Sequence, residues 1–268
     1  MKLVIVFLAL LCILYVLATR CRGNHPQMDS LRGRSYAHRG LHGDGVPENS
    51  MKAFRLALEA GYGIELDIHL MQDGKLAVIH DSSLKRTAGV DVIVEELTES
   101  ELSNFFLGGS EEKIPLLSQV LELYKGEAPL IVELKSWKGN HAQLCKAACE
   151  LMEAYNGVYC MESFDPRCVA WLRKNRSDVI RGQLTENFFR SNSRLPWILK
   201  FVMKHQLLNF LTRPDFVAYR YSDRKTLSNF LCRKLWGMQG VSWTLCSQEE
   251  LDAAVREGWI PIFEGFRP

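Results

Sequence analysis

Residues 64–81 read I-E-L-D-I-H-L-M-Q-D-G-K-L-A-V-I-H-D, and this stretch decides the fold class of the chain. Its apolar runs predict a strand over residues 64–70 and a second over residues 76–80, with the turn signal D-G at residues 73–74 between them. A helix is predicted just upstream, over residues 51–60, because its apolar residues recur at helical spacing and a glycine follows them. A helix that leads into a buried strand is the repeating unit of an α/β protein.

The same alternation continues along the rest of the chain. Strands are expected at 35–39, 64–70, 130–135, 158–163, 179–184, 216–220, 241–245 and 260–263, and helices at 51–60, 116–124, 141–155, 166–175, 190–211, 224–236 and 247–257. With residues 76–80 assigned to an excursion, this pattern favours a TIM-type (β/α)8 barrel over an open sheet. The irregular residues after 82 predict a small insertion after the second strand.

Composition excludes collagen-like, low-complexity and intrinsically disordered proteins. The 268 residues are 47% hydrophobic and 24% charged, which is ordinary for a globular chain. Thirty-three basic residues against 31 acidic ones leave a formal charge of +2, so no nucleic-acid partner is expected. Eight cysteines are too few for a disulfide-stapled scaffold. The composition leaves the oligomeric state open.

The N-terminal residues form a separate segment. Leu3–Ala18 is uncharged and lies between basic residues. The residues after it make a poor cleavage site for a secretory signal. With Thr19 the run reaches about 17 residues, the short end of what spans a bilayer. The expected organisation is therefore a transmembrane anchor over 1–20, a linker over 21–33 and a barrel over 34–268, with a small insertion at about 84–113.

Charge and cysteine usage favour a barrel on the cytoplasmic side of the cell membrane. Basic residues follow the apolar run at Arg20, Arg22, Arg32 and Arg34. The cysteines show no pairing pattern, as in reduced proteins. The apolar segment Leu195–Leu211 is interpreted as an outer helix of the barrel, with a helix pressed to a lipid surface as the alternative.

Two pairs of charged residues lie on successive barrel strands. Glu65 and Asp67 are two residues apart and share one face of their strand, as do Glu133 and Lys135 on the next. Charges that point into a barrel are costly unless they serve a site. Three converging carboxylates are hard oxygen ligands, which predicts one divalent cation, Mg²⁺ or Ca²⁺.

Two histidines lie where strands end. His38 is followed by Arg39, and His80 by an aspartate. A pair of imidazoles can supply a general base and a general acid near neutral pH. Arg39 and Lys135 can neutralise a phosphoryl group. Together with a metal, these groups indicate hydrolysis of a phosphate ester.

Short motifs distributed over roughly residues 34–264 resemble those of the glycerophosphodiester phosphodiesterase family. They are A-H-R-G at 37–40, P-E-N-S at 47–50, E-L-D at 65–67, D-G-K-L-A-V-I-H-D at 73–81, I-P-L-L at 114–117, V-E-L-K at 132–135, E-S-F at 162–164 and S-W-T at 242–244. The resemblance implies a TIM-type barrel that cleaves a small-molecule glycerophosphodiester to sn-glycerol 3-phosphate and an alcohol, with a metal.

The resemblance also implies roles for single residues. It places the metal at Glu65, Asp67 and Glu133, acid–base catalysis at His38 and His80, and phosphate binding at Arg39 and Lys135. Trp243 is expected to pack against the glycerol, Glu48 to support the His38 loop, and residues 84–113 to lie over the active site.

The sequence departs from the family pattern at the substrate end of the barrel. Cys246 stands where an asparagine is usual, and the last strand ends in F-E-G-F from Phe263 instead of T-D-x-P. These changes leave the head group open. Two alternatives stay open as well: a phospholipase D that acts on lysolipids or sphingolipids with the same fold, and a catalytically silent interaction module tethered to a membrane.

Overall fold

The computed structural model describes residues 1–191 and 193–268, which form a closed barrel of eight parallel strands. These are β1 (Tyr36–His38), β2 (Gly63–Leu70), β4 (Leu130–Leu134), β5 (Tyr159–Ser163), β6 (Arg181–Thr185), β7 (Phe216–Arg220), β8 (Gln239–Leu245) and β9 (Trp259–Phe263). The strands pair in chain order, and β1 pairs with both β2 and β9, which closes the ring. The predicted TIM-type barrel is confirmed.

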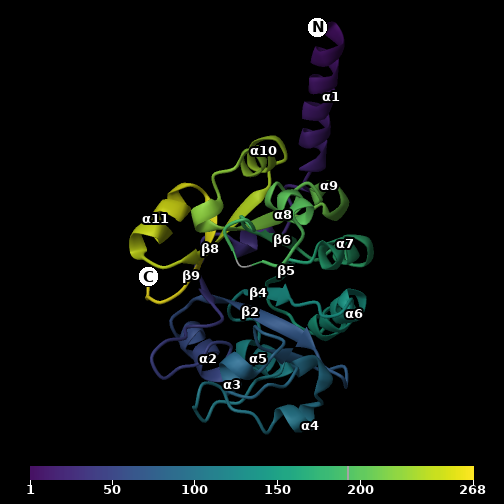
Figure 1. Cartoon of the computed structure of the whole chain (residues 1–268). Coiled ribbons are helices and arrows are strands. Elements are labelled where there is room, and N and C mark those ends of the chain that lie inside the picture. The colour runs from purple at the N-terminus through teal and green to yellow at the C-terminus, as the bar shows by residue number, and fades with distance from the viewer. Residues whose placement is uncertain (192) are drawn as a thin grey trace.

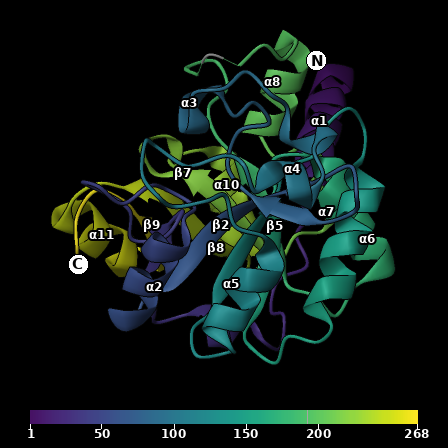
Figure 2. The same cartoon turned by 90° about the horizontal axis from the view of Figure 1, so that it is seen from below.

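Helices surround the barrel (Figures 1 and 2). They are α2 (Met51–Glu59), α5 (Leu117–Tyr124), α6 (His141–Met152), α7 (Pro166–Asn175), α8 (Trp197–Lys204), α9 (Asn209–Thr212), α10 (Leu227–Leu235) and α11 (Gln248–Arg256), with a short 3₁₀ turn η3 (Tyr221–Asp223) before α10. Ser50, Asp165, Thr226 and Ser247 accept a backbone hydrogen bond at the starts of α2, α7, α10 and α11. Such caps satisfy amide donors that a helix leaves unpaired.

Side chains of the strands alternate between the surrounding helices and the barrel interior. On β2, Ile64, Leu66 and Ile68 are fully buried in the larger apolar core. A second core, which includes Ile131 and Phe216, fills one end of the interior. The Phe216 ring takes the space beside Gly182, where an added Cβ would lie 2.1 Å from it. The inward positions beyond this apolar layer carry the charged residues of the site.

The chain leaves the barrel after β2 and forms a small unit with its own core. Strand β3 (Leu76–Val78) pairs antiparallel with β2, and α3 (Lys85–Ala88), η2 (Val94–Glu96) and α4 (Glu99–Leu102) follow. Its core includes Leu84, Leu102 and Leu107, all buried. The residues predicted as an insertion, 84–113, lie in this unit.

Helix α1 (Lys2–Ala18) projects away from the barrel, on the side opposite α4 (Figure 1). It has 17 residues and buries none of them. In the described parts of the chain no helix is long and apolar enough to cross a membrane, so the predicted transmembrane anchor is not supported. An α-helix of this length spans about 25 Å, less than the hydrocarbon thickness of about 30 Å. The cytoplasmic placement of the barrel stays a prediction.

The segment predicted as a linker packs on the barrel. Cys21, Met28 and Leu31 are buried, and Met28 and Leu31 lie in η1 (Met28–Leu31) at the apolar end of the interior. The helix predicted over 190–211 is wrong in extent. Among the described residues of that range only α8 and α9 are α-helical. Residue 192 lies outside the described residues. Helix α8 buries only Met203, so the apolar face predicted to pack on the barrel is largely exposed.

Candidate active site

Four buried carboxylates gather inside the barrel beyond its apolar layer. Asp67 of β2, Glu133 of β4 and Glu162 of β5 are in register on neighbouring strands. Glu65 of β2 is paired in register with His38 of β1. Their exposures are 2% for Glu65, 1% for Asp67, 6% for Glu133 and 1% for Glu162. Alternation with a period of two places all of them on the inward face.

Burial and mutual repulsion dominate the electrostatics of this cluster. Burial raises the pKa of Glu65 well above its usual range, and the nearby charges of Asp67 and Glu133 add to the shift. Burial also raises the pKa of Glu133 to about 7. Asp67 differs, because Lys135 and other positive groups overcome its burial and lower its pKa. If all four carboxyls were ionised, their negative charge would exceed the positive charge of Lys135 and Arg39 beside them.

The donor set fits a hard divalent cation. Glu65, Asp67 and Glu133 each offer an oxygen, and these oxygens lie within 4.8 Å of one another. The Oε2 atom of Glu162 is buried and has no hydrogen-bond partner among the described residues. Clustered carboxylate oxygens are what Mg²⁺ and Ca²⁺ bind. The structure thus brings the three predicted ligands together and adds Glu162 beside them.

The two predicted phosphate-binding residues border the carboxylates. Lys135 Nζ lies 3.0 Å from Asp67 Oδ1 and 2.8 Å from Glu133 Oε2, and these contacts raise the Lys135 pKa although burial opposes them. Arg39 Nε is 3.4 Å from Asp67 Oδ2. The Arg39 amide donates to Glu65 Oε2 at 3.2 Å, from a backbone with φ of +53°. Both cations remain charged at neutral pH.

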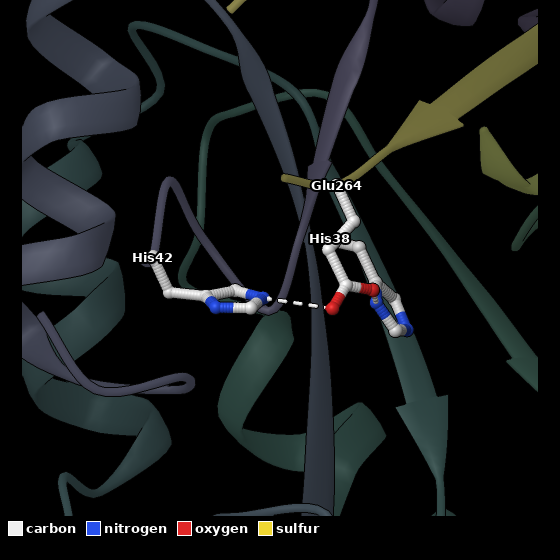
Figure 3. A group of neighbouring side chains, drawn as sticks. All are labelled: His38, His42 and Glu264. Atoms are coloured by element: carbon white, nitrogen blue, oxygen red, sulfur yellow. Dashed lines mark hydrogen bonds and ion pairs between the residues drawn. The ribbon is translucent and has the colours of Figure 1, made fainter. Parts of the chain in front are cut away.

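His38 is held by a carboxylate that the sequence reasoning did not assign. Its Nδ1 lies 2.6 Å from Glu264 Oε2, and its Nε2 lies 3.8 Å from Glu65 Oε2. The bond to His38 is the main cause that lowers the Glu264 pKa to about 2. His42 contacts the other oxygen of Glu264 at 3.5 Å, so this carboxylate faces both imidazoles (Figure 3).

His80, like His38, has its Nδ1 atom held by a carboxylate. Its Nδ1 lies 2.6 Å from Asp81 Oδ1, while Asp81 Oδ2 accepts from Arg86 at 2.5 Å. Burial, and then the charge of Lys135, lower the His80 pKa to about 4. The ring of His69 is 3.1 Å from the His80 carbonyl oxygen and 2.6 Å from Glu95. His69 therefore supports the His80 loop.

Glu48 links the His38 loop to the insertion. It accepts from Arg39 at 3.0 Å and from both terminal nitrogens of Arg86, on α3, at 2.7 and 2.9 Å. These bonds lower the Glu48 pKa although burial opposes the shift. Glu48 thus has a supporting position, and α3 lies at the edge of the site.

Trp243 lies near the carboxyl end of β8. Its Nε1 donates to the Ala218 carbonyl at 3.1 Å, and its ring meets Phe164 edge to face with centroids 5.7 Å apart. It lines a cavity of about 400 Å³ together with Arg220, Tyr221 and Glu264. Trp243 therefore shares a cavity with the carboxylate that holds His38.

Sequence reasoning assigned no role to several residues of the site, namely Glu162, Glu264, Asp81, Arg86 and Asn49. The Asn49 Nδ2 atom donates a hydrogen bond to Asp67 Oδ2 at 2.9 Å. Glu162 could have been found, because it stands two residues after Cys160 on the inward face of a barrel strand. Arg86 gave no such signal, since its position depends on how the insertion folds back.

Comparisons with known proteins find related sequences. The model of the family described as "Glycerophosphoryl diester phosphodiesterase family" matches residues 38–250. The Bacillus subtilis protein YhdW is 38% identical over 80% of this chain and 86% of its own length. Lysophospholipase D GDPD1 of Mus musculus is 34% identical over 61% of this chain and 50% of its own.

A solved structure supports the fold. An Oleispira antarctica phosphodiesterase in complex with the product sn-glycerol-3-phosphate superposes with a TM-score of 0.72, at 20% identity, over 88% of this chain and 94% of that one. The chain spans about half the length of several of the curated relatives that it matches.

Proposed function

The chain belongs to the glycerophosphoryl diester phosphodiesterase family, and from this premise we propose that it hydrolyses glycerophosphodiesters to sn-glycerol 3-phosphate and an alcohol. The observation that carries the proposal is one constellation at the open end of the barrel. It combines buried carboxylates, two cations, and two histidines whose Nδ1 atoms are held by Glu264 and Asp81. The related phosphodiesterase complex with sn-glycerol-3-phosphate supports this product class.

In this proposal Glu65, Asp67 and Glu133 hold one divalent cation, Mg²⁺ or Ca²⁺. When bound, such an ion polarises a phosphoryl oxygen and stabilises the charge that develops there. Glu162 has a buried oxygen without a partner among the described residues and stands beside these ligands. Arg39 and Lys135 add positive charge for the phosphate, Arg39 through its planar guanidinium.

His38 and His80 divide the proton transfers. Cleavage of a phosphodiester needs a base at the attacking oxygen and an acid at the leaving oxygen. In each histidine Nδ1 faces a carboxylate, at 2.6 Å in both cases, which fixes the ring and leaves Nε2 for the reaction. Trp243 shares a cavity with Glu264, the carboxylate that holds His38, and packs against the glycerol or its leaving group.

A second candidate keeps the site and changes the substrate. The mouse relative is named a lysophospholipase D. Helix α8 exposes apolar side chains, with Trp197 71% and Ile198 56% exposed. These two observations support lysolipids as the second candidate class of substrate. The intact set of carboxylates, histidines and cations argues against a silent interaction module.

One assay tests both candidates. The full chain is incubated with Mg²⁺ or Ca²⁺ and either glycerophosphocholine or lysophosphatidylcholine, and released choline is measured. We expect turnover of glycerophosphocholine, with sn-glycerol 3-phosphate as the second product. Turnover of lysophosphatidylcholine alone would show that the enzyme acts on lysolipids, as in the second candidate function. No turnover of these two substrates, or of glycerophosphodiesters with other head groups, with either ion would contradict the proposal.

A further inference from the structure

A second group of possible metal ligands lies beside the carboxylate cluster. His38, His42 and Glu264 each offer one donor atom, and these atoms lie within 4.8 Å of one another. The residues come from the end of β1, from the loop before α2 and from the segment after β9 (Figure 3). They are all partly buried, with side-chain exposures of 15%, 18% and 35%. The function proposed above uses His38 but gives His42 no part.

The backbone holds His42 in place. The His42 amide donates to the Gly40 carbonyl at 2.9 Å, and the Leu41 amide donates to the Ala53 carbonyl at 3.0 Å. Gly43 and Val46 then form a small bridge that closes the loop. His42 therefore approaches Glu264 from a defined turn.

One of the two donor distances already suits a tetrahedral ion, and the other requires a side-chain adjustment. Two metal–ligand bonds of about 2.0–2.1 Å at a tetrahedral angle separate their donor atoms by roughly 3.4 Å. His42 Nε2 is 3.5 Å from Glu264 Oε1, which already matches. His38 Nδ1 and Glu264 Oε2 are 2.6 Å apart and must separate. Glu264 is exposed enough to rotate, so this adjustment needs no movement of the barrel.

The donor chemistry differs from that of the neighbouring cluster. Two imidazoles and one carboxylate favour Zn²⁺ and related transition ions, whereas Glu65, Asp67 and Glu133 offer only oxygens. We propose that His38, His42 and Glu264 form a separate site for Zn²⁺, and that its occupation inhibits the enzyme.

Inhibition follows from the chemistry of His38 and rests on the function proposed above. A metal at Nδ1 replaces the bond to Glu264. The remaining ring proton then stays on Nε2, and neither nitrogen has a lone pair that can accept another proton. His38 can then no longer cycle between its neutral and charged forms, which acid–base catalysis requires.

Binding is tested first, without reference to activity. Calorimetry measures Zn²⁺ uptake by the full chain in excess Mg²⁺. We expect one site whose affinity falls at least tenfold in His42→Ala and stays within threefold of the wild type in Glu133→Gln. His25→Ala is the matched control, because His25 contacts the Asp178 carbonyl near the apolar end of the barrel. Loss of Zn²⁺ binding in Glu133→Gln, with full binding in His42→Ala, would assign the ion to the carboxylate cluster and overturn the proposal.

Inhibition is tested next, with each variant compared with its own zinc-free rate. The Zn²⁺ concentration for half inhibition should rise at least tenfold in His42→Ala and stay unchanged in His25→Ala. Equal sensitivity of these two variants would refute the inhibitory role. An enzyme inactive on all phosphodiesters would refute the proposed function, while the calorimetric result on the site would still stand.

Discussion

At the residue scale, the strongest signal is the burial of like charges. Glu65 and Glu133 have raised pKa values because burial and neighbouring carboxylates penalise their ionised forms. A folded chain tolerates such a cluster when a cation compensates for it, since uncompensated buried charge is costly. The cluster thus ties the stability of the chain to the ion it is proposed to bind.

Metal binding should therefore be measurable as stability. A ligand that binds only the folded state adds about 2.7 kcal/mol when its concentration is 100 times its dissociation constant. Saturating Mg²⁺ or Ca²⁺ should raise the Tm of the wild type by several degrees, as measured by calorimetric scanning. Asp67→Asn should abolish both this rise and turnover. Full turnover in excess EDTA after dialysis would show that the carboxylates do not hold an essential ion.

The two histidines should each carry a large share of the rate. His38→Ala and His80→Ala should each lose about 10²–10⁴-fold in kcat/KM, the usual contribution of a positioned acid or base. The wild-type profile of kcat/KM against pH should be bell-shaped. A nitrophenyl diester, whose leaving group needs no proton, should restore activity selectively in the variant that lacks the acid. The assignment is wrong if both variants stay within threefold of the wild type on the natural substrate.

At the element scale, the period-two pattern of the strands made the barrel and much of the site predictable. Glu65, Asp67, Glu133 and Lys135 could be placed on inward faces because each strand by itself shows the alternation. Strand register could not be read from the sequence, and it is register that puts Glu162 beside Glu133. The segment after β9 brings Glu264 to His38 only when the ring closes between β1 and β9, a contact over 226 residues.

Packing inside the barrel gives a test at this scale. Gly182→Ala would place a Cβ 2.1 Å from the Phe216 ring, and overpacking of this kind costs about 1–3 kcal/mol. The Tm should fall by several degrees, at about 2–4 °C per kcal/mol. Gly43→Ala is the control, because an added Cβ there meets no atom within 4 Å. Equal Tm values for the two variants would show that the interior has room beside Phe216.

At the scale of the whole molecule, the end of α8 and helix α10 lie near the base of α1 (Figure 1). Tyr15 of α1 approaches His205 at 3.4 Å, just after α8, and the Thr19 carbonyl accepts from Cys232 of α10 at 3.3 Å. Large apolar side chains of all three helices are exposed: Leu3, Phe7, Leu11 and Leu14 on α1, Trp197 and Ile198 on α8, and Leu227 and Phe230 on α10. Exposed apolar side chains in such number favour association in water.

We therefore expect the full chain to self-associate in buffer without detergent, as measured by sedimentation velocity. A variant that lacks residues 2–14 should sediment as a smaller species. Its Tm should lie within about 2 °C of the full chain in detergent, since α1 buries none of its residues and surface changes cost little. Turnover should also be unchanged, because no residue of the site lies in α1. A full chain that is monomeric without detergent would show that this surface does not drive association, and a large loss of Tm in the variant would show that α1 stabilises the barrel.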